Sequence, residues 1–83
     1  MISIQLIQGT FNSKEVVEII TEMIHVKIKY HENKISKSSN EEDMKYRETK
    51  IKNLQKELYK LRNDLDSKNG NVTMNASIKI QLT

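Results

Sequence analysis

Two histidines and one acidic run are the side chains of this sequence that could serve in metal binding or acid–base catalysis. His25 and His31 are six positions apart, so at about 100° per residue they lie about 120° apart around a helix. Histidines four apart on one helix face can share a zinc ion, and these two cannot. Glu41, Glu42 and Asp43 stand where a helix is expected to begin, and carboxylates there stabilise the helix dipole.

The sequence also lacks the motifs of the common enzyme classes. It has no cysteine, no glycine-rich phosphate loop and no nucleophile elbow, and no histidine pair is placed beside a carboxylate. We therefore expect no catalytic residue, no metal ligand and no cofactor, and we do not expect an enzyme.

Four lysines could contact nucleic-acid phosphates from one side of an expected second helix. Glu48 and Glu57 interleave with them, which is typical of a solvated helix face. The net charge is only +3, and the basic residues are mostly lysine, whereas arginine is the better reader of base edges and phosphates. Nucleic-acid association is therefore the alternative function rather than the leading one. The four lysines are Lys45, Lys52, Lys56 and Lys60.

The composition predicts a single small domain, residues 1–83, with a thin core. Hydrophobic residues make up 36% of the sequence and charged residues 30%. A domain of this size buries only about 60–65% of the surface of its unfolded chain. No apolar run approaches the roughly 18 residues that a membrane span needs, and no signal-peptide pattern opens the sequence. We expect a cytoplasmic protein without membrane contact.

Glycine and proline mark where the elements are expected to change. Gly9 and Gly70 bracket a long stretch that contains neither glycine nor proline, which indicates long helices. Outside this stretch, apolar and polar residues alternate with the period of two of a half-buried strand. The alternation predicts strands over residues 2–8 and 71–82. The apolar residues of the second strand are Val72, Met74, Ala76, Ile78, Ile80 and Leu82.

The first helix is expected over residues 13–36, with Asn12 as its N-cap and Glu15 completing a capping box. Residues 24–31 also alternate between apolar and polar, so a strand there remains the alternative. Two apolar stripes run along the helix, roughly 130° apart around its axis. The first stripe consists of Val16, Ile19, Met23, Val26 and Tyr30. The second stripe consists of Val17, Ile20, Ile24, Ile28, His31 and Ile35.

A second helix is expected over residues 40–68, after a polar turn. Ser39 and Glu42 are placed to form its capping box. Its apolar positions form a narrow seam like that of a coiled coil, with Arg47 at the one polar step. This leucine seam consists of Met44, Ile51, Leu54, Leu58, Leu61 and Leu65.

Together these elements predict an α+β fold of the order β-α-α-β, in which a long antiparallel helical hairpin is flanked by two strands that pair antiparallel. We expect the first stripe to meet the leucine seam. The second stripe is then the candidate surface for a second copy of the chain or for another partner. A two-stranded sheet is at best marginally stable alone, so we expect it to extend across a homodimer. The leading function is a non-enzymatic interaction or assembly module that acts as a homodimer, and a further protein partner, which the sequence does not identify, stays open.

Overall fold

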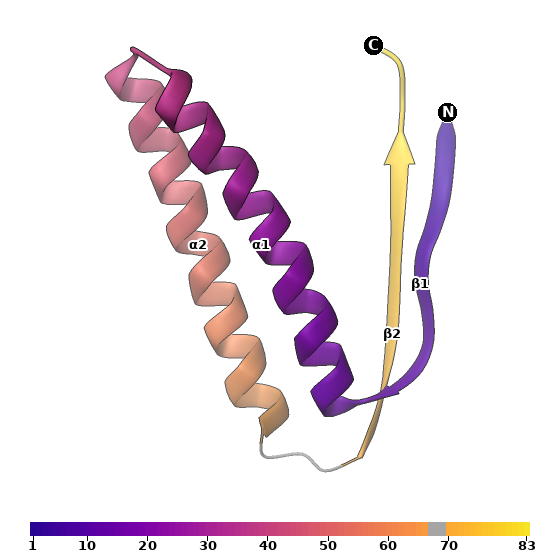
Figure 1. The fold of residues 1–83 in the computed structure, drawn as a ribbon. Coiled ribbons are helices and arrows are strands. Elements are labelled where there is room, and N and C mark those ends of the chain that lie inside the picture. Colours follow the sequence, from indigo (N-terminus) through magenta and orange to yellow (C-terminus); the bar gives the residue numbers. More distant parts are fainter. Residues whose placement is uncertain (67–69) are drawn as a thin grey trace.

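A computed structural model describes residues 1–66 and 70–83 and shows a helical hairpin beside a two-stranded ribbon (Figure 1). The two helices lie side by side, joined by a short turn. The two strands pair antiparallel in one sheet. The predicted β-α-α-β fold is therefore confirmed. In chain order the elements are β1 (Ile2–Asn12), α1 (Ser13–Lys37), α2 (Glu41–Asp66) and β2 (Asn71–Ile80).

Helix α1 begins where the sequence predicts, because Asn12 caps it. Asn12 Oδ1 accepts a hydrogen bond from the Glu15 N–H at 2.8 Å, and Asn12 Nδ2 donates to Glu15 Oε1 at 2.6 Å. The helix then continues without a break to Lys37, so the alternative of a strand over residues 24–31 is wrong. The Ser13 N–H donates to the Gly70 carbonyl at 3.2 Å. This bond ties the start of α1 to the start of β2, at a point that we call the junction.

Helix α2 is capped by Asn40, one residue after the predicted cap. Asn40 Oδ1 accepts hydrogen bonds from the N–H groups of Glu42 and Asp43, at 2.9 and 3.2 Å. The prediction of a Ser39 cap is wrong because the helix begins one residue later, where the longer Asn40 side chain satisfies two unpaired N–H groups of the first turn at once.

The remaining boundaries differ from the prediction by a few residues. Strand β1 runs past residue 8 to Asn12, and β2 stops at Ile80 rather than at Leu82. Helix α2 is described to Asp66, and its predicted end at Lys68 lies outside the described residues. The hairpin and the ribbon start together at the junction and diverge from it (Figure 1).

A bulge in β1 keeps the apolar residues of that strand on one face of the ribbon. Gln5 faces Ser77 and Ile7 faces Ala76, so Leu6 is an extra residue without a counterpart in β2. The apolar positions of the sequence change from even to odd numbers at this point. Because side chains alternate between faces, a regular ladder would turn half of β1 over, and the bulge prevents this. The apolar face therefore pairs Ile2, Ile4, Ile7 and Phe11 with Ile80, Ile78, Ala76 and Val72.

The cap geometry predicts different costs for two neighbouring alanine substitutions. Asn40→Ala should lower the free energy of unfolding by about 1 kcal/mol, because two N–H groups lose their acceptor. Ser39→Ala is the matched control and should change it by less than about 0.5 kcal/mol. Urea unfolding followed by circular dichroism measures both. Equal losses at the two positions would contradict the Asn40 cap.

Deleting Leu6 tests the role of the bulge. The shortened strand alternates regularly, with Ile4, Ile7 and Phe11 still on the apolar face, so the melting temperature should stay within about 5 °C of the parent chain. Deleting Ser77 from the regular strand is the control. It turns the residues beyond it to the polar face and should lower the melting temperature by more than about 10 °C. Similar damage from both deletions would show that the bulge does not set the register.

Candidate interaction surface

The second stripe of α1 forms the core of the hairpin with α2, although the first stripe was expected there. Met23, Val26 and Tyr30 of the first stripe are exposed. All members of the second stripe are half-buried or buried, and His31 among them is hydrogen-bonded to Arg47 of α2. The expectation that the first stripe meets the leucine seam is therefore wrong. The residues covered within the chain are Val17, Ile20, Ile24, Ile28, His31 and Ile35.

A match between polar residues explains this arrangement. Each facing surface has one polar member, Arg47 in the leucine seam and His31 in the second stripe. Arg47 Nη1 lies 3.2 Å from His31 Nδ1, and Arg47 Nε lies 3.3 Å from Asp43 Oδ2. Because a guanidinium only donates hydrogen bonds, His31 Nδ1 must accept, and the neutral ring carries its proton on Nε2. The second stripe thus supplies the acceptor that a guanidinium needs within an apolar seam.

His31 lies in surroundings that oppose its protonation. The side chain is only 7% exposed, and within the described part of the chain its Nε2 has no hydrogen-bond partner. Burial, followed by the positive charges of Arg47, Lys27 and Lys50, lowers the pKa of His31 below the usual value of 6.5. A proton on Nδ1 would also replace the hydrogen bond to Arg47 with a contact between two cations. The neutral form of the ring is therefore the one that the hairpin accommodates.

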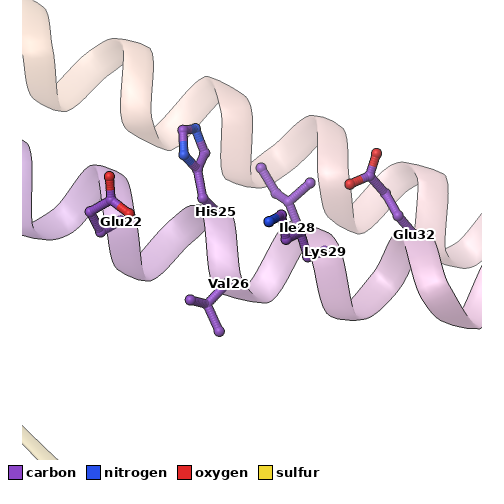
Figure 2. A pocket seen from close by; sticks show the side chains of 6 residues that line it. All are labelled: Glu22, His25, Val26, Ile28, Lys29 and Glu32. Carbon is purple, nitrogen blue, oxygen red and sulfur yellow. The ribbon is translucent and has the colours of Figure 1, made fainter.

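The first stripe is covered near the junction and uncovered away from it. Val16 is 4% exposed, Met23 is 38% exposed and Val26 is 69% exposed. Tyr30, at the far end of the stripe, is 53% exposed. Val26 points to the side of α1 away from α2 (Figure 2). The first stripe is therefore the apolar part of α1 that remains available to another surface.

The apolar face of the ribbon is likewise covered near the junction and exposed away from it. Near the junction, Phe11, Val72 and Met74 are half-buried. At the other end of the ribbon, the large apolar residues of both strands are exposed, while α1 diverges from the strands (Figure 1). We call the exposed apolar residues of the first stripe of α1 and of the two strands the open apolar surface. It consists of Ile2, Ile4, Leu6, Met23, Val26, Tyr30, Ile78 and Ile80.

The shape of the chain explains why so much apolar surface stays open. The Cα atoms extend over 47 × 34 × 13 Å, so the hairpin and the ribbon form one thin layer. The radius of gyration is 15.6 Å, whereas a compact domain of this length has about 12 Å. The accessible surface is 6888 Å², whereas a folded monomer of this mass exposes about 5,100 Å². One copy of the chain therefore exposes about a third more surface than a folded monomer of its mass.

The four lysines of the alternative function are on one exposed side of α2. They are separated by seven, four and four residues, and α2 is helical across all of them. The helical spacing places them together as a row along α2. Phosphate binding by this row stays a prediction. The row is Lys45, Lys52, Lys56 and Lys60.

A shallow hollow on α1 is lined by side chains of both charge signs together with the apolar Val26 and Ile28. His25 lines it and is exposed, whereas His31 is buried against α2, so the structure does not bring the two histidines together. Across residues 1–66 and 70–83, no group of three or more His, Cys, Asp or Glu side chains could hold a metal ion. The lining residues are Glu22, His25, Val26, Ile28, Lys29 and Glu32 (Figure 2).

The lowered pKa of His31 predicts that acid weakens the hairpin. The unfolded chain takes up a proton at this residue below about pH 6.5, whereas the folded chain takes it up only at lower pH. The free energy of unfolding should therefore be full above that pH and fall as the pH drops from about 6.5 through the folded pKa. Urea unfolding between about pH 7.5 and about pH 5 measures this loss.

Two glutamine substitutions separate His31 from the other titrating groups. His31→Gln keeps an acceptor for Arg47 but does not titrate, so it should remove the loss of stability that begins near pH 6.5. His25→Gln changes an exposed histidine of the same helix and should leave the loss unchanged. An unaltered pH dependence in His31→Gln would contradict this role of His31.

Comparisons with known proteins identify no relative of this chain. No protein-family model matches the sequence, and searches of the curated proteins and of the solved structures find no significant match. Among the described residues, no helix combines the length and the apolar character needed to cross a membrane.

Proposed function

We propose that this chain is a non-enzymatic interaction or assembly module that acts in the cytoplasm as a homodimer. The observation that supports the proposal is the single layer, 13 Å thick, with an open apolar surface on α1 and on the ribbon. Folded domains are built from at least two layers packed around a hydrophobic core. A second copy supplies the missing layer, and the polar side of α1 then faces solvent or further partners.

The exposed area is sufficient for such an interface. A stable interface buries about 800 Å² on each partner, and the surface that this chain exposes beyond that of a folded monomer is about twice as large. The surface is also suited to self-association, because an isologous dimer places the same patch on both copies. Within the described residues the buried hydrophobic side chains are Val16 and Leu58, so the core of a single copy is thin.

A charge in the first stripe tests the proposal. Val26 is exposed in one copy, so Val26→Glu leaves the monomer fold intact but places a carboxylate in the interface. We expect the dimer dissociation constant to rise at least tenfold, about 1.4 kcal/mol, in sedimentation equilibrium. His25→Glu is the matched control, since it adds the same carboxylate to the neighbouring position on the other side of the helix (Figure 2).

The oligomeric states of the parent chain and of the two variants decide whether the proposal holds. The proposal requires a dimeric parent, a weakened Val26→Glu dimer and an unchanged His25→Glu dimer. A parent chain that sediments as a fully folded monomer at tens of micromolar would contradict the homodimer. Equal weakening by both variants would contradict the placement of the interface on the first stripe.

A further inference from the structure

The two free edges of the ribbon differ in their ability to pair with another strand. Within residues 1–66 and 70–83 the sheet consists of β1 and β2, so each strand has one unpaired edge. Such an edge presents free N–H and C=O groups to any other extended chain, and natural proteins either blunt it or use it.

The edge of β1 is blunted by the bulge. Leu6 breaks the ladder, and the Gln5 side chain is tied to this irregular segment. Gln5 Nε2 lies 3.0 Å from the Ile7 carbonyl, 3.3 Å from the Ala76 carbonyl and 2.7 Å from Asn75 Oδ1. Bulges interrupt pairing and twist an edge away from other strands. A further strand cannot run regularly along β1.

The edge of β2 is regular throughout. Every residue from Asn71 to Ile80 has a register partner in β1, and the extra residue lies in β1, not in β2. The strand contains no proline, and Lys79 is its only charged residue. Prolines, bulges and charges are the usual devices that protect an edge, and of these β2 has a single lysine near its end.

The position of β2 in the fold favours the same edge. In Figure 1, β2 lies between β1 and α1, and α1 diverges from it, whereas β1 lies at the rim of the molecule. A strand added beside β2 enters the side of the ribbon that faces α1, and Val26 of α1 is exposed and points away from α2 (Figure 2). A strand added beside β1 would leave the first stripe open. Pairing through β2 therefore brings the second copy to the side of the ribbon that faces the first stripe of α1.

We propose that β2 pairs antiparallel with β2 of a second copy across a two-fold axis, and this inference rests on the homodimer proposed above. The result is a four-stranded sheet in the order β1-β2-β2-β1. An axis perpendicular to the sheet keeps the apolar faces of both ribbons on one side. The antiparallel direction places the covered, junction end of one ribbon beside the open end of the other.

Symmetry restricts the register of this pairing. Directly opposed residues of two antiparallel strands point to the same face of the sheet. The two-fold axis must therefore pass between the two copies of one residue, which is then paired with itself. Strand β2 covers Asn71–Ile80. The registers that keep most of it paired place Asn75 or Ala76 on the axis.

Single cysteines test the pairing directly, because the chain has no cysteine of its own. Full-length variants carry one cysteine each at Thr73, Asn75, Ala76 or Ser77 and are equilibrated in a glutathione redox buffer. We expect Asn75→Cys or Ala76→Cys to form a disulfide with its own copy. Two residues from the axis the equivalent Cβ atoms are about 13 Å apart, so the disulfide yield there should be at least tenfold lower.

Two controls separate this inference from the homodimer itself. Gln8→Cys places a thiol opposite Asn75, on the strand whose edge is blunted, and Val26→Cys places one on the first stripe. Sedimentation of each reduced variant reports the oligomeric state independently. A dimer with a sharp disulfide maximum at Asn75 or Ala76 supports the pairing. A dimer without this maximum, or with its highest yield at Gln8 or Val26, overturns the β2 edge and leaves the homodimer standing. A folded monomer overturns both.

Discussion

Every apolar stripe of an amphipathic element needs a surface to cover it, and this chain carries more stripes than one copy can cover. Helix α1 has two stripes, α2 offers one seam, and the ribbon contributes an apolar face that meets α1 only near the junction. Packing the second stripe on the leucine seam leaves the first stripe and the far half of the ribbon open. The thin layer, the small core and the excess of exposed area all follow from this shortage of cover.

The types and the order of the elements could be predicted because their signals are local. Alternation at both ends indicates strands, and Asn12 with Glu15 marks the start of α1. The choice between the stripes could not be predicted from apolar periodicity, since both stripes are continuous and nearly equal in length. The structure packs the second stripe on α2, where His31 contacts Arg47, and that is a tertiary contact. The single polar member in each facing surface was the available signal. The two uncovered sets, on α1 and on the ribbon, follow from this choice.

The end of β1 and the start of α2 show how geometry overrides local preference. Gly9 suggested that the first strand ends early, yet β1 continues past it with Gly9 at a φ of 150° opposite Met74. Glycine adopts such a φ without the steric strain that a Cβ brings, so it prolongs this strand instead of ending it. The change of apolar phase at Leu6 and Ile7 was readable in the sequence and indicates the bulge. At α2, Ser39 and Asn40 are both good caps, and the length of the turn selects Asn40.

The central claim is that one copy of the chain lacks a layer and that association supplies it, so folding and association should be coupled. The concentration dependence of the melting temperature tests this most directly. If the folded state is the proposed dimer and the unfolded state is monomeric, circular dichroism melts over a hundredfold range of chain concentration should show a melting temperature that rises steadily with concentration. A cooperative transition at the same temperature across the whole range would contradict the account, since the single layer would then be stable without a partner.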